Sequence, residues 1–107
     1  MPASLTSNKE TSMKDKTTKK EFYKILSRLQ KMQLECFKAG SVTSLEVKPF
    51  CSDVDYTIYV TAWNENVVRR SSDGEVMHFD SFYFYSFRSY EQNEEEVQRI
   101  VDFLSIA

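Results

Sequence analysis

Apolar residues recur at intervals of three and four along residues 19–39. The stripe consists of Phe22, Ile25, Leu26, Leu29, Met32 and Cys36, widened by Tyr23, Leu34 and Phe37. This spacing matches the α-helical turn, so the pattern predicts a helix over residues 19–39 with one buried face. Thr18 and Glu21 form a capping box at its start, and Gly40 is placed to end it in the left-handed conformation.

The middle of the chain alternates between apolar and polar residues, a pattern typical of β-strands. Residues 42–48 place Leu45 and Val47 on one side, and we expect Pro49 to end that strand's ladder. Residues 54–63 and 75–87 are rich in β-branched and aromatic side chains. A tight turn at Asp73-Gly74 joins them into a long hairpin that spans residues 56–90, because glycine accepts a positive φ without strain.

A second helix is predicted near the C-terminus. Ser89 or Asn93 can cap it, because each has a capping-box partner three residues later, Gln92 or Glu96. Its apolar stripe comprises Val97, Ile100, Val101 and Leu104, with Phe103 beside it. The predicted fold class is therefore α+β: a three-stranded antiparallel meander with one helix before it and one after it, both on one sheet face.

The pairing of the hairpin decides which side chains share a face. With Arg70 and Glu75 flanking the turn, Trp63 is expected opposite Phe82. One face then carries Tyr56, Ile58, Val60, Ala62, Val68, Met77, Phe79, Tyr83, Tyr85 and Phe87. The other carries Tyr59, Thr61, Trp63, Val67, Val76, His78, Asp80, Phe82 and Phe84. We expect the helices on the first face, although a bulge near residues 64–66 would shift the register and exchange part of this assignment.

The second face carries more aromatic residues than a solvent-facing sheet surface needs. Tyr59, Trp63, Phe82 and Phe84 are therefore the candidate partner-binding residues. Three interpretations remain open: the face is covered within the chain, it forms a homodimer interface, or it recognises another molecule. Among functions we favour a small non-enzymatic interaction or adaptor protein, with the homodimer as the first choice of partner.

Composition limits the other possibilities. A length of 107 residues indicates one domain. A net charge of −2 argues against a protein that binds polyanions in general. Residues 1–17 are rich in Ser, Thr and Lys, which predicts a disordered basic tail before a single domain over residues 18–107. Neither a signal peptide nor a run of membrane-spanning length is evident, so we expect a cytoplasmic protein with no membrane partner.

Candidate chemistry is sparse, and the sequence predicts no enzyme, cofactor or metal site. Cys36 and Cys51 lack zinc or disulfide spacing and are expected to be buried, reduced thiols. His78 and Asp80 would share a face, and a His–Asp pair can support a general base. No nucleophile is placed near them, so we expect a strand histidine bonded to a neighbouring carboxylate and no catalytic role. The two glycines are explained by the helix end and the turn, which leaves no phosphate-binding loop.

The alternative function is a single-stranded nucleic-acid-binding module. Bases would stack on the aromatic face, while positive charge would come from Arg69, Arg70, Lys19 and Lys20. The order helix, three strands, helix also occurs in double-stranded-RNA-binding domains. Those domains grip phosphates with lysines at the start of the last helix, where this chain has Glu94, Glu95 and Glu96, so we do not expect that function.

Overall fold

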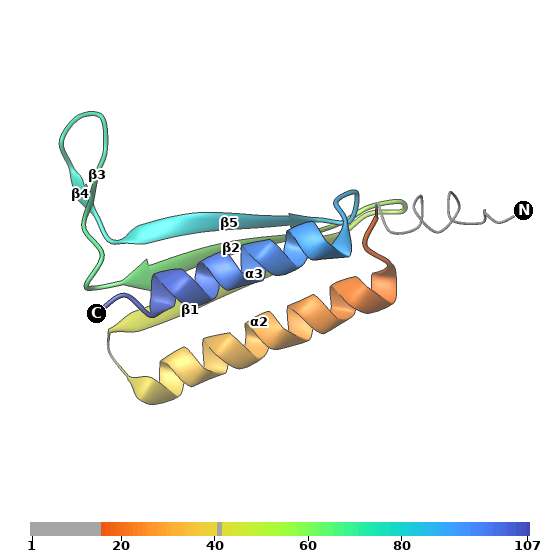
Figure 1. Cartoon of the computed structure of the whole chain (residues 1–107), viewed down its shortest axis with the longest axis horizontal. Coiled ribbons are helices and arrows are strands. Elements are labelled where there is room, and N and C mark those ends of the chain that lie inside the picture. The colour runs from red at the N-terminus through yellow and green to blue at the C-terminus, as the bar shows by residue number, and fades with distance from the viewer. Residues whose placement is uncertain (1–15, 41) are drawn as a thin grey trace, which may run out of the picture.

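A three-stranded antiparallel sheet in the order β1-β2-β5 packs against two helices (Figure 1). The computed structural model describes residues 16–40 and 42–107, so the expected tail lies, except for Lys16 and Thr17, outside the described residues. The elements are α2 (Lys19–Ala39), β1 (Thr43–Cys51), β2 (Tyr56–Asn64), β3 (Arg69–Arg70), β4 (Val76–Met77), β5 (Phe79–Tyr85) and α3 (Tyr90–Leu104). Strands β3 and β4 form a separate two-stranded ribbon.

The predicted α+β class is confirmed, with both helices on the same side of the sheet (Figure 1). The core lies between the helices and this side of the sheet. Its buried apolar residues are Phe22, Ile25, Leu29 and Cys36 from α2, Leu45, Ile58, Val60, Ala62, Phe82 and Phe84 from the sheet, and Val97, Ile100 and Phe103 from α3; Val67 joins them from the connection between β2 and β3.

The helix boundaries follow local signals in the sequence. Thr18 and Glu21 form both bonds of the capping box, and Gly40 ends α2 with φ of 85° in the left-handed region. Of the two candidate caps for α3, the structure selects Ser89, whose side chain accepts the Gln92 N–H. Because these signals involve groups only three or four residues apart, they do not depend on the rest of the fold.

The hairpin register differs from the predicted one. Trp63 lies opposite Phe79 in the β2–β5 pair, whereas Arg69 lies opposite Met77 in the ribbon. Between these two pairs, residues 64–68 on one side face only His78 on the other. The extra residues form a turn in which Asn64 O accepts the Val67 N–H and the Asn64 side chain accepts the Asn66 N–H. Relative to the predicted pairing, in which Trp63 faces Phe82, this insertion shifts β5 along β2 so that Trp63 faces Phe79.

The shift moves two candidate partner-binding residues to the other face of the sheet. A register change by an odd number of residues exchanges the faces of a strand. Phe82 and Phe84 therefore point toward the helices and are buried, which corrects their expected place on the open face. Tyr83, Tyr85 and Phe79, which we expected under the helices, take the open face instead.

Strand β1 continues past Pro49 to Cys51, so the prediction that Pro49 ends the ladder is wrong. In an antiparallel pair, alternate residues direct their main-chain groups toward the neighbouring strand. The Glu65 N–H bonds Val42 O, which places Ser44, Glu46, Lys48 and Phe50 in the bonds to β2. Pro49 faces the outer edge of β1, where a missing N–H removes no ladder bond.

The start of the domain is bonded to the junction between β5 and α3. The Thr17 N–H donates to Ser86 O at 3.0 Å, and the Thr17 hydroxyl donates to Arg88 O at 2.8 Å. The buried Asn93 amide of α3 donates to both the Thr17 hydroxyl and Tyr85 O. Thr17, expected at the end of the tail, is thus a buried residue of the packed structure.

Candidate functional site: the open aromatic sheet face

Five aromatic rings cross the side of the sheet that faces away from the helices. We call them the aromatic row: Phe50, Tyr59, Tyr83, Tyr85 and Phe87. Neighbouring ring centroids are 5.2 Å apart for Phe50–Tyr59, 5.6 Å for Tyr59–Tyr83, 6.4 Å for Tyr83–Tyr85 and 4.9 Å for Tyr85–Phe87. These separations lie in the range of favourable aromatic pairs, so the rings form one continuous surface.

The strand register positions the row. Tyr59 pairs with Lys48 on one side and with Tyr83 on the other, and side chains directly opposite share a face. Phe50 lies two residues from Lys48 on β1, which keeps it on the same face. Phe87 lies just past the end of β5 and extends the row by stacking on Tyr85. Each ring is therefore placed by backbone pairing or by a neighbouring ring.

The row is open to solvent and has a polar surround. Tyr59 and Tyr83 are 41% and 43% exposed, and Phe50 and Phe87 are more exposed still. Thr57, Thr61 and Ser81 lie among the rings on the same face by strand pairing. At one end, the Arg88 guanidinium lies 4.7 Å from the centroid of the Tyr85 ring, within cation–π range. An aromatic centre with polar neighbours is the composition of a protein interface.

Two of the four predicted partner-binding residues lie on this face. Tyr59 is a central member of the row. Trp63 is half-buried near the β3–β4 ribbon, with its ring 6.2 Å from that of His78. Sequence reasoning missed Tyr83, Tyr85 and Phe87 as open-face residues. The polar run at residues 64–66 was the available signal, because it marks the insertion that sets the register.

The structure does not gather the four candidate nucleic-acid contacts beside the row. Arg69 and Arg70 form the β3 strand of the ribbon, whereas Lys19 and Lys20 begin α2 at the opposite end of the sheet (Figure 1). Arg69 pairs with Asp80 at 3.4 Å, and its guanidinium lies 5.8 Å from the centroid of the Phe103 ring. Lys19 Nζ lies 5.6 Å from the Tyr56 ring. Arg88 and Lys48, which the sequence did not single out, are cations next to the row.

The residues considered for chemistry have separate partners. His78 Nδ1 lies 2.6 Å from Val67 O, while Asp80 pairs with Arg69. Both cysteines are free thiols, but Cys51 is exposed, which corrects the expectation that both are buried. Within residues 16–40 and 42–107, no group of three or more His, Cys, Asp or Glu side chains is placed to hold a metal ion. In the same part of the chain, no helix has the length and apolarity to cross a membrane.

Comparisons with known proteins add no family to this description. No family model matches the chain, and no match is found among curated proteins or among solved structures. The geometry of the open face is therefore the basis for a functional proposal.

Proposed function

We propose that this chain is a non-enzymatic interaction protein that associates with a second copy of itself through the aromatic row. The observation that carries the proposal is the uninterrupted contact of five rings, four of them solvent-exposed and Tyr85 half-buried, on the face that neither helix covers. Burying such rings against an apolar partner is favourable by about 25 cal/mol per Å² of apolar area removed from water. An exposed row of this kind is typical of an interaction site.

A two-fold pairing of sheet faces suits these residues. Two sheets can pack face to face about 10 Å apart, with the side chains of both inner faces interdigitating. Tyrosine contributes apolar ring area and a hydroxyl that reaches a polar partner, so Tyr59, Tyr83 and Tyr85 suit a surface that is wet in the monomer and buried in the dimer. Lys48 and Glu46, 3.8 Å apart beside the row, form part of its polar rim.

Molar mass in solution tests this proposal. We expect the intact chain to have the mass of a dimer by light scattering, and the double variant Tyr59→Ala/Tyr83→Ala to have the mass of a folded monomer. Tyr23→Ala is the matched control, because Tyr23 is an exposed tyrosine on α2, away from the open face. A folded intact chain that stays monomeric at all concentrations would contradict the proposal.

Single-stranded nucleic acid is the second candidate for the same face. The stacked pair Tyr85–Phe87 and the Arg88 guanidinium over Tyr85 favour it, since stacking platforms beside a cation bind bases without sequence preference. This candidate predicts binding to an oligonucleotide that weakens as salt concentration rises and that is reduced in Arg88→Ala. Binding that is independent of ionic strength would count against it.

A further inference from the structure

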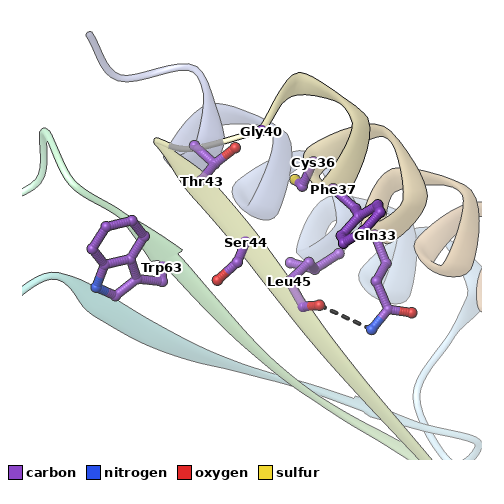
Figure 2. A pocket seen from close by; sticks show the side chains of 8 residues that line it. All are labelled: Gln33, Cys36, Phe37, Gly40, Thr43, Ser44, Leu45 and Trp63. Carbon is purple, nitrogen blue, oxygen red and sulfur yellow. Dashed lines mark hydrogen bonds between the residues drawn. The ribbon is translucent and has the colours of Figure 1, made fainter.

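The outer edge of β1 has unpaired main-chain groups. Because Ser44, Glu46, Lys48 and Phe50 bond to β2, the N–H and C=O groups of the alternate residues face away from the sheet. These residues are Thr43, Leu45, Val47, Pro49 and Cys51. Among the described residues, the one hydrogen bond at this edge joins the Gln33 side chain of α2 to Leu45 O at 2.9 Å (Figure 2).

The edge of β5 is different, because side chains occupy it. The Glu96 carboxylate accepts the Tyr83 N–H at 3.1 Å, and the Arg88 guanidinium donates to Tyr83 O at 3.2 Å. The Asn93 amide donates to Tyr85 O, and the Asp80 carboxylate accepts the Ser81 N–H. Sheet edges that must not pair with other chains are commonly blocked by such side chains. Within the described residues, the β1 edge is therefore the edge of the three-stranded sheet that can pair with another strand.

Measured across the sheet, helix α2 reaches past the outer edge of β1, the strand that it covers. Helix α3 packs on both β2 and β5, whereas α2 packs mainly on β1 and is drawn beside the β1 edge of the sheet in Figure 1. A helix with its side chains is about 10 Å wide, and neighbouring strands lie about 4.8 Å apart, so one helix can cover two strands. The sheet is thus one strand narrower than its two helices can cover, and the vacant position is next to β1.

Two hollows mark this seam between α2 and β1. One, of about 300 Å³, is lined by Phe22, Tyr23 and Leu26 of α2 and by Pro49 and Phe50 of β1, among others. The other, of about 500 Å³, is lined by Gln33, Cys36 and Phe37 of α2 and by Leu45 of β1, among others (Figure 2). Leu45 and Pro49 are four residues apart, about 13 Å along a strand. Side chains at positions i and i+4 of an added strand match this separation and share one face.

The seam also has a distinct charge. Lys20, Lys24, Lys31 and Lys38 recur along one side of α2 at helical spacing. On the helix surface this row is adjacent to the stripe of Tyr23, Leu34 and Phe37, all of which are exposed. Phe37, at 83%, is the most exposed large apolar side chain among the described residues. Lys19 lines the smaller hollow itself. A segment docked at this seam would therefore contact Lys19 and lie near the lysine row on the outer side of α2.

We propose that the β1 edge binds an extended, acidic segment of another protein as a fourth strand of the sheet. The segment carries apolar residues at alternate positions, which enter the two hollows, and Asp or Glu residues that lie beside the lysine row. Main-chain bonds to Val47 N–H, Val47 O, Leu45 N–H and Pro49 O supply affinity, and the hollows supply specificity. This site shares Phe50 with the aromatic row, but its main-chain edge and its α2 side do not depend on the proposed self-association.

Selection from an unbiased library of ten-residue peptides, with the intact chain as bait, tests this proposal. We expect selected peptides to alternate apolar residues with others that are enriched in Asp and Glu. On binding, the amide hydrogens of Leu45 and Val47 should exchange more slowly, whereas those of Glu46 and Lys48, already in the ladder, should change little. A library that yields no binder, or binders that leave the Val47 amide unprotected, would overturn the proposal.

Variants of the edge distinguish strand addition from other modes of binding. Val47→Pro removes one outward N–H, as Pro49 already does, and should lower peptide affinity at least tenfold. Phe37→Asp and Lys24→Glu/Lys31→Glu change exposed residues of α2 and should weaken binding without unfolding the protein. Tyr83→Ala, on the open face and one strand further from the β1 edge, should leave peptide affinity unchanged. If Val47→Pro instead turned a dimer into a monomer, the edge would belong to a second copy and the proposed peptide would be wrong.

Discussion

Phe79 and Phe82 lie three residues apart on β5 and point to opposite faces of the sheet. Phe79 is 44% exposed beside Trp63, whereas Phe82 is 1% exposed and packs edge-on against Phe103 of α3, with ring centroids 6.0 Å apart. The residues are chemically identical, so their environments alone decide what each contributes. The difference in burial between the two rings therefore follows from the β2–β5 register, which also places the aromatic row on the open face.

Truncating these two phenylalanines should have very different effects on stability. Phe82→Ala removes a buried ring and leaves a cavity, which we expect to lower the free energy of unfolding by about 3–5 kcal/mol. Phe79→Ala removes a half-exposed ring and should cost less than about 1 kcal/mol. Urea unfolding of both variants measures the difference. Equal losses, or a larger loss for Phe79→Ala, would mean that the register is not the one described.

The Asn64 side chain should be essential for stability because it connects three segments. It is fully buried, donates to Phe103 O and Ile106 O at 2.9 Å each, and accepts the Asn66 N–H. Asn64→Ala leaves these groups without their partner, and we expect a loss of about 1–3 kcal/mol in unfolding free energy. Asn66→Ala is the control, because its exposed side chain should contribute little. Similar losses for both variants would refute this role for Asn64.

The contacts of Asn64 also show why the sequence predicted the helices better than the hairpin register. Thr18, Gly40 and Ser89 act through groups within three or four residues, so their effect can be read from the sequence. The register depends on Asn64, whose partners at Phe103 and Ile106 are about forty residues away. Its contacts form only once α3 is in place. The prediction that aromatics crowd the second face was right, but Phe82 and Phe84 were assigned to it wrongly.

The hydroxyl of Thr17 should hold the start of the domain against the β5–α3 junction. Thr17→Val keeps the shape of the side chain but removes the donor to Arg88 O and the acceptor for the Asn93 amide. We expect the variant to lose about 1–3 kcal/mol, because the Asn93 amide is buried. Thr61→Val, at an exposed open-face position, is the matched control. Unchanged thermal and urea stability of Thr17→Val would contradict this assignment.

An ion pair between the helices should make stability depend on acid pH. Arg28 Nη1 lies 2.5 Å from Glu94 Oε1. Burial raises the pKa of Glu94, but hydrogen bonds from Tyr90 and Arg28 outweigh it and hold the pKa below its ordinary value of 4.5. A carboxyl with a lowered pKa contributes stability above its ordinary value, and this contribution is lost as pH falls through the folded-state pKa.

Glu94→Gln tests this pH dependence. Because Arg28 is half exposed, we expect the variant to be less stable than the intact chain by no more than about 1 kcal/mol at pH 7. The difference should shrink below pH 4.5 and vanish in stronger acid, where the native carboxyl is also protonated. Urea unfolding at several pH values measures it. A difference that stays constant with pH would rule out the carboxylate as its source.

The most direct test of self-association through the aromatic row is an isotope-filtered NOE measurement on a mixture of labelled and unlabelled chains. Such NOEs arise only between protons of different copies. The proposal predicts intermolecular contacts among the rings of Phe50, Tyr59, Tyr83, Tyr85 and Phe87, and their loss in Tyr59→Ala/Tyr83→Ala. A folded protein without intermolecular NOEs, or with NOEs confined to α2 and the β1 edge, would contradict it.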